Sequence, residues 1–167
     1  MAQKVNADKI KKAVRQSVPL AIKSYTLPHE TEEQLEEILG TFLHEFRQDS
    51  LKDRLAYCMK ELTVNAKKAN TKRVYFKDKG LDINNPDDYA EGMKSFKEET
   101  LSNIDYYLNL QKQEGLYIKV VFHAQKDTFT LSIRNNTRIS RKEQMRVYDR
   151  IARSRAFKTM EEALSTV

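Results

Sequence analysis

The sequence predicts an α+β protein with a small mixed or antiparallel sheet, covered on one face by helices and preceded by N-terminal helices. Three observations predict this class. Apolar residues recur at helical spacing in several long segments. Two β-rich runs, at residues 116–124 and 128–134, flank a short hairpin connection. The length of 167 residues suits one compact domain, and the chain shows no internal repeat.

Composition excludes several classes. No apolar stretch approaches the roughly 20 residues of a membrane span, and the N-terminus lacks the pattern of a secretory signal. A single cysteine cannot form an internal disulfide. The four glycines are far apart, so no glycine-rich phosphate loop is present. We therefore expect a cytoplasmic protein.

Helices dominate the first 70 residues, where apolar residues recur at i, i+3 and i+4. The predicted helices cover residues 6–18, 31–46 and 50–70. A capping box at residues 31–34 opens the second, which carries the clearest apolar stripe. We expect residues 1–49 to form a separate helical segment. The stripe from Leu35 to Phe46 is a candidate homodimer surface.

The remaining elements mix strands and helices. In chain order they are a strand over 71–77, a helix over 86–113, strands over 116–124 and 128–134, and helices that begin at residues 140 and 159. A second capping box, Ser140-Arg-Lys-Glu143, opens the first of the last two helices.

Three polar residues of the 50–70 helix are candidates for chemistry. Glu61, Asn65 and Lys68 lie within roughly 60° of arc at the border of the apolar stripe. An amide oxygen with water suits Mg²⁺, a carboxylate can orient or deprotonate a water, and a lysine can bind phosphate. A solvated helix flank would show the same residues, so the spacing leaves both interpretations open.

The segment Glu61-Leu-Thr-Val-Asn65-Ala-Lys-Lys68 resembles the N-box of the GHKL family of ATPases and histidine kinases, whose pattern is Glu-Leu-x-x-Asn-Ala-x-Lys. In that family a strand follows this helix, and a later hairpin ends at an adenine-binding turn. Residues 71–77 and 116–136 resemble these pieces. The resemblance covers about residues 51–140 and includes a helical insertion at 78–114.

This resemblance implies a partial Bergerat-like ATP-binding fold for residues 50–167, incomplete at its C-terminus, in a signalling kinase or regulatory ATPase. It implies ATP and Mg²⁺ as cofactors, with Asn65 as the metal ligand. Glu61 would act on the attacking water or phosphoacceptor, and Lys68 would lie near the phosphates.

The adenine-binding turn of the family is Asp-x-Gly-x-Gly, which aligns here with residues 135–139. Asn135 can accept a hydrogen bond through its amide oxygen, and Asn136 and Thr137 follow it in the implied nucleotide site. Thr137 and Ile139 replace glycines that let the backbone approach the base. The glycine-rich lid is missing, so the resemblance implies a truncated or degenerate member.

Two other functions remain open. One is a non-catalytic interaction module that keeps the fold, with an unidentified signalling partner. The other is nucleic-acid binding by the basic stretch at 134–158, which carries nine Lys or Arg against two acidic residues in a chain of net charge +6. On the predicted helix there, Arg146, Arg150 and Arg153 share one face.

His44 and Cys58 are weaker candidates. The segment His44-Glu-Phe-Arg resembles a histidine-kinase phosphoacceptor box, but only twenty residues separate His44 from Asn65, too few for the helical hairpin of that family. We expect His44 to serve packing or the surface. Cys58 falls on the predicted apolar stripe, and we expect it to be a buried thiol.

Overall fold

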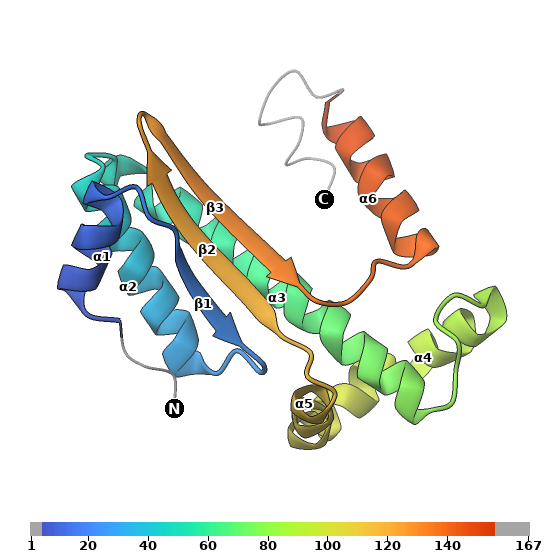
Figure 1. Cartoon of the computed structure of the whole chain (residues 1–167). Helices are drawn as coiled ribbons and strands as arrows, with labels where there is room; N and C mark the ends of the chain where they lie inside the picture. Colours follow the sequence, from blue (N-terminus) through green and yellow to red (C-terminus); the bar gives the residue numbers. More distant parts are fainter. Residues whose placement is uncertain (1–4, 156–167) are drawn as a thin grey trace.

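The computed structural model describes residues 5–155, which form six α-helices, a short 3-10 helix and one three-stranded antiparallel sheet (Figure 1). In chain order the elements are α1 (Ala7–Arg15), β1 (Leu20–Ser24), α2 (His29–Glu45), η1 (Asp49–Leu51), α3 (Lys52–Asp78), α4 (Pro86–Ser102), α5 (Ile104–Gln113), β2 (Ile118–Gln125), β3 (Thr128–Asn135) and α6 (Arg141–Ser154). The predicted α+β class is confirmed. Within residues 5–155 every helix is too short or too polar to cross a membrane.

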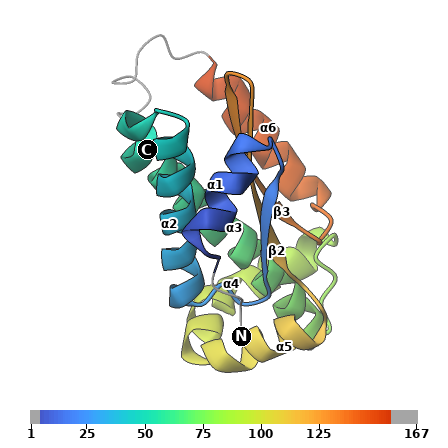
Figure 2. The same cartoon turned by 60° about the vertical axis from the view of Figure 1, so that its left-hand side comes forward.

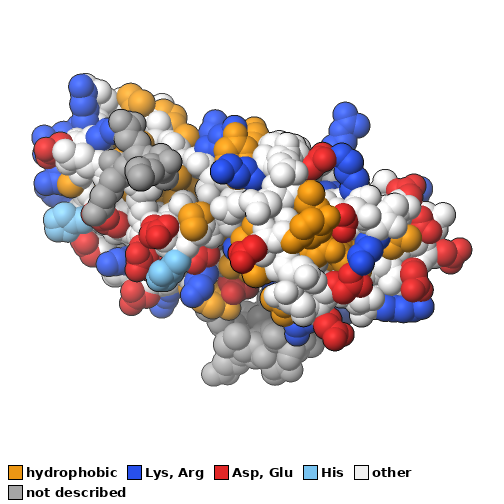
Figure 3. Space-filling model, turned by 90° about the horizontal axis from the view of Figure 1, so that it is seen from below, with side chains coloured by type: hydrophobic (Ala, Val, Ile, Leu, Met, Phe, Trp, Pro, Cys, Tyr) orange, Lys and Arg blue, Asp and Glu red, His pale blue; other side chains and the backbone are white. Residues whose placement is uncertain are grey.

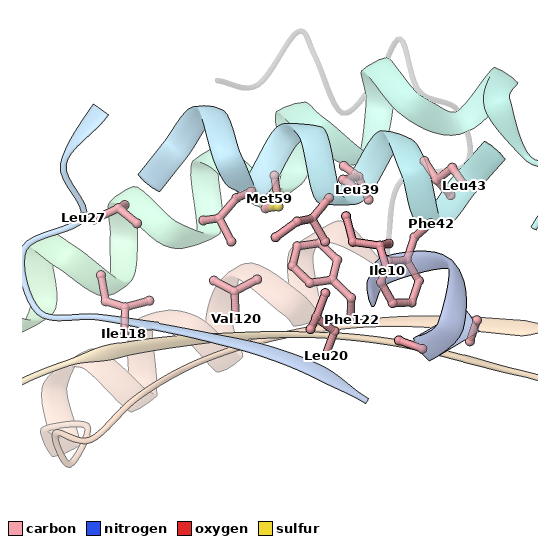
Figure 4. Close-up of a cluster of buried hydrophobic side chains, with 14 residues drawn as sticks. Ile10, Leu20, Leu27, Leu39, Phe42, Leu43, Met59, Ile118, Val120 and Phe122 are labelled. Atoms are coloured by element: carbon pink, nitrogen blue, oxygen red, sulfur yellow. The ribbon is translucent and has the colours of Figure 1, made fainter. Parts of the chain in front are cut away.

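The main core lies between the sheet and helices α1, α2 and α3, which cover one face of it (Figures 1 and 2). Strand β2 is central and pairs antiparallel with both β1 and β3. Alternate residues of β2 point to the helices because side chains of a strand alternate between its faces. Figure 4 shows Val120 and Phe122 on the sheet beneath Leu39 and Phe42 of α2. The rings of Phe42 and Phe122 stack with centroids 5.7 Å apart.

Strand β1 was not predicted. Its five residues follow Pro19, four residues after α1 ends at Arg15, and only Leu20 and Ile22 carry the alternating apolar pattern. The strand forms because it pairs with β2, about 100 residues further along the chain. The core therefore crosses the expected boundary at residue 49. The stripe from Leu35 to Phe46 packs in this core, so it is not exposed as the homodimer surface that we expected.

Residues 71–77 form the last two turns of α3 and not the predicted strand. Val74, Tyr75 and Phe76 are consecutive apolar residues, and such a run predicted a strand. In the structure all three are buried. They are all buried because α4 and α5 pack around this end of α3 and enclose a second, smaller core. The insertion at 78–114 thus contributes its own cluster.

Two helix boundaries also differ from the prediction. The helix expected over 86–113 divides at Asn103, whose backbone leaves the helical region at φ −125°. Helix α2 begins at His29, so Thr31 lies buried inside it and caps nothing. The hairpin of β2 and β3 is confirmed, while the helix expected from residue 159 lies outside the described residues.

Gly92 of α4 lies against the second core. A Cβ there would come within 2.7 Å of Phe76 Cζ and 3.0 Å of Leu81 Cδ1. We expect Gly92→Ala to lower the free energy of unfolding by about 1–3 kcal/mol, measured by urea denaturation, because overpacking outweighs the helix propensity of alanine. The matched control is Gly40→Ala in α2, where the added Cβ meets only the flexible side chain of Lys52. Equal changes in both variants would contradict this packing.

Candidate functional site

A cavity of about 290 Å³ lies between α3, the turn after β3 and the start of α6. Ten residues from these three segments line it: Asn65, Ala66, Ala69, Arg73, Asn135, Thr137, Arg138, Ile139, Glu143 and Val147. The N-box-like segment and the candidate adenine-binding turn, about 70 residues apart in the chain, therefore share one cavity.

The structure brings together some of the candidate site residues. Asn65, Asn135 and Thr137 line the cavity, with Asn65 exposed at its rim. Glu61 and Lys68 are exposed on α3 and are not among the lining residues. The three-residue face predicted on α3 therefore contributes only its amide to the cavity wall.

Asn136 has a structural contact. Its Oδ1 accepts a hydrogen bond from the backbone N–H of Tyr117 at 2.7 Å, and its Nδ2 donates to the carbonyl of Gly115 at 3.1 Å. Both bonds join the end of β3 to the start of β2. The side chain of Asn136 thus closes the open end of the hairpin and is not among the residues that line the cavity.

Asn70 positions the cavity wall, although the sequence did not identify it. The residue is fully buried on α3, and its Nδ2 donates to the carbonyl of Tyr117 at 3.3 Å. Its Oδ1 accepts from Asn135 Nδ2 and from Thr137 Oγ1, each at 3.2 Å. Asn135 Nδ2 also donates to Thr137 Oγ1 at 2.9 Å. These bonds hold the turn after β3 against α3.

The same bonds orient the amide of Asn135. Its nitrogen is engaged by Asn70 and Thr137, while its Oδ1 makes no hydrogen bond within residues 5–155. The side chain therefore brings a hydrogen-bond acceptor to the cavity wall.

Glu143 closes one side of the cavity with a network of ion pairs. Its carboxylate accepts from Arg73 Nη1 at 3.2 Å and Nη2 at 2.5 Å, and from Lys72 Nζ at 3.2 Å. The backbone N–H and the hydroxyl of Ser140 also donate to it at 3.0 Å. Arg73 Nη2 donates further to the carbonyl of Arg138 at 2.8 Å. The network attaches the start of α6 to the C-terminal part of α3.

This environment lowers the pKa of Glu143 to about 2. Burial of the carboxyl by itself raises the pKa, because it removes water from the charged form. Hydrogen bonds from Arg73 and Ser140, together with the charge of Arg73, outweigh that effect. The carboxylate is therefore ionised at neutral pH, and Arg73 is occupied by it.

The three arginines of the basic face predicted on α6 are all exposed, but two of them already contact groups of the protein. Arg146 Nη1 donates to the hydroxyl of Tyr89 at 3.2 Å, and its guanidinium lies 5.7 Å from the centroid of that ring. Arg153 pairs with Asp149 at 3.0 Å. Arg150 is exposed. Two of the three arginines thus have partners within the protein.

The weaker candidates lie away from the cavity. His44 is exposed, with Nδ1 at 3.0 Å from Asp49 Oδ1. Cys58 is exposed, so the expectation of a buried thiol is wrong. The face of α3 that packs on the core passes through Met59 and Thr63, which places Cys58 just outside it.

The sequence missed three residues that organise the site, Asn70, Arg73 and Glu143. A signal existed only for Glu143, through its capping box with Ser140, and it indicated a helix start without indicating the partner on α3. Asn70 and Arg73 have no sequence signal, because their partners are 47 to 70 residues away along the chain.

An uncharacterized protein of Treponema pallidum (strain Nichols) is 47% identical over 163 residues, which is 98% of this chain and 32% of that protein. The chain therefore spans about a third of the length of the curated relative that it matches. No family model matches the chain, and no solved structure matches it.

Proposed function

We propose that the chain is a divergent GHKL-like nucleotide-binding domain, part of a cytoplasmic histidine-kinase-like signalling kinase or regulatory ATPase. One observation carries the proposal. The cavity of about 290 Å³ is walled by Asn65 of the N-box-like segment and by the turn at residues 135–139. The resemblance in sequence implies that these two segments meet at a nucleotide, and in this fold they meet.

The cavity wall fits the base of an adenine nucleotide. Asn135 Oδ1 is an acceptor without another partner among the described residues. Ala66, Ala69, Ile139 and Val147 supply apolar surface for a ring. The volume is close to the lower end, about 300 Å³, of common ligand pockets. Thr137 and Ile139 occupy positions where the family has glycine, which narrows the approach to the base.

The wall fits magnesium only together with a nucleotide. Asn65 offers one amide oxygen, and Mg²⁺ in nucleotide sites takes few protein ligands and completes its shell with phosphates and water. Within residues 5–155 no three His, Cys, Asp or Glu side chains form a metal cluster. Any metal here would be held by Asn65 and the phosphates.

In this proposal Mg-ATP supplies the transferable phosphoryl group, and the residues of the chain bind and orient it. Asn135 accepts from the adenine amino group, while the exposed Arg138 at the cavity wall is available to the phosphates. Glu61 lies one helical turn before Asn65 on α3, where its carboxylate would hold a proton of the attacking group. Lys68, exposed on α3, would approach the phosphates from outside the cavity.

Calorimetric titration with Mg-ATP tests the proposal. We expect the wild-type protein to bind and Asn135→Leu to bind at least about tenfold more weakly, because the acceptor for the base is lost. Asn65→Asp should change the magnesium dependence of the heats, since it alters the metal ligand. The matched control is Asn109→Asp, the same change at an exposed site on α5. Equal weak heats for all four proteins would remove the nucleotide function.

A non-catalytic interaction module is the second candidate, and α6 favours it. Met145 and Tyr148 are 67% and 60% exposed on this helix, which leaves apolar surface open to a partner. Sedimentation discriminates between the candidates. A self-association that is independent of nucleotide, in a protein that gives no heat with Mg-ATP, would favour the module.

A further inference from the structure

One face of the sheet packs against α1, α2 and α3, and the opposite face presents a row of positive charges. Lys23 of β1 lies directly across from Lys119 of β2, which lies directly across from Arg134 of β3. All three side chains are exposed. They alternate with the residues of their strands that pack in the main core, so they point away from α1, α2 and α3. A line of cations therefore crosses the whole sheet.

This row has no acidic partner in the described part of the chain. None of the three strands contains Asp or Glu, and none of Lys23, Lys119 and Arg134 forms an ion pair within residues 5–155. Like charges directly opposite on a sheet face are destabilising. By contrast, the face seen from below in Figure 3 mixes acidic and basic side chains. The sheet face thus carries a positive field that an external anion would relieve.

Two aromatic rings border the row. Lys23 Nζ lies 4.1 Å from the ring centroid of Tyr117 and 5.0 Å from that of Tyr25. The backbone at both tyrosines is held by side chains. Gln111 Nε2 donates to the carbonyl of Tyr25, and the N–H of Tyr117 donates to Asn136 at 2.7 Å. The rings therefore stand on a rigid part of the fold beside the cations.

We propose that this open sheet face binds single-stranded nucleic acid. Phosphates would contact Lys23, Lys119 and Arg134, and bases would stack on Tyr117 and Tyr25. Charge complementarity with stackable rings is the combination that single strands require. A lipid surface is favoured less, because the strands present no long exposed aliphatic side chain on this face. The inference is independent of the nucleotide cavity.

Fluorescence anisotropy with labelled 20-mers of dT and rU, at salt from 50 to 300 mM, tests the proposal. We expect the K23Q/K119Q/R134Q protein to lose about 2 units of the slope of log K against log salt, since each phosphate contact on a single strand contributes about 0.7. The matched control is K12Q/K97Q/K112Q, which removes three exposed helical lysines and the same charge. The control should retain the wild-type slope.

Stacking has its own readout. Tyr117→Leu should weaken binding about tenfold and leave the salt slope unchanged, because a ring is lost and no cation is. Tyr148→Leu on α6 is the control and should bind like the wild type. Circular dichroism of each variant verifies the fold.

Three results would overturn the proposal. The first is an equal loss of binding in the two triple variants, which would show that binding depends on the net charge of the protein and not on the sheet face. The second is binding to duplex DNA as tight as to single strands. The third is capture by phosphatidylglycerol vesicles that depends on Lys119 while the oligonucleotides do not bind.

Discussion

Replacing Glu143 with glutamine is expected to weaken the attachment of α6 to α3 by about 3 kcal/mol. The side chains of Glu143, Lys72 and Arg73 are each only 15–16% exposed. Glutamine would keep an acceptor but leave two buried cations without their counter-charge. Native-state hydrogen exchange over residues 141–154 measures the effect. The opening equilibrium of α6 should rise roughly a hundredfold.

The pH dependence of the same contact follows from the pKa of Glu143, which is about 2 in the folded protein against an ordinary 4.5. A lowered pKa means that the ionised carboxylate stabilises the folded state. This contribution is fully present above pH 4.5 and is lost as the pH falls toward 2. Wild-type α6 should lose protection across that range, whereas Glu143→Gln should lack this part of the dependence.

The matched control is Glu91→Gln, which removes a carboxylate paired with Lys94 at the surface, where both side chains are at least 66% exposed. Exposed pairs contribute little, so its effect should stay below about 0.5 kcal/mol. If Glu143→Gln and Glu91→Gln changed protection equally, the network around Glu143 would not be what holds α6.

Replacing Asn70 with alanine is expected to lower the free energy of unfolding by about 2–4 kcal/mol, measured by urea denaturation. The side chain is fully buried and bonds to three groups, on Tyr117, Asn135 and Thr137. Each buried polar group left unpaired costs about 1–3 kcal/mol, and Asn135 and Thr137 retain their bond to each other. The turn after β3 should also loosen.

Two controls isolate this effect. Asn109→Ala removes an exposed amide on α5 and should change the stability by no more than about 0.5 kcal/mol. A double-mutant cycle with Asn135→Ala should give a coupling energy of at least about 0.5 kcal/mol, because the two amides share a hydrogen bond. Strict additivity would show that Asn70 acts without Asn135.

Elements with a local signal were predictable. Helix α2 shows its apolar face at i, i+3 and i+4, and the hairpin of β2 and β3 shows alternation on both sides of a short turn. The helical course of residues 71–77 was not predictable. A helix end that is buried on several sides has consecutive apolar residues, and this is the sequence pattern of a buried strand. Strand β1 was missed because its partner is about 100 residues away.

The residues of the candidate site were also predictable only in part. The resemblance indicated six residues. Asn65, Asn135 and Thr137 line one cavity, whereas Glu61, Lys68 and Asn136 are not among the lining residues. The spacing that also selected Glu61 and Lys68 describes only a face of a helix, and it does not specify which part of that face meets another element. Asn70, Arg73 and Glu143 acquire their roles through contacts between α3 and the segment that follows β3.

The sequence by itself determined the α+β class, the amphipathic helices and the hairpin, since hydrophobic periodicity is a local property that burial then satisfies. Only the tertiary structure decided the pairing of β1 with β2 and the continuous course of α3 through residues 71–77. It also decided the attachment of α6 to α3 and the alignment of three cations across the open sheet face. These features depend on pairs of residues distant in the chain, and such pairs meet only when the whole core forms.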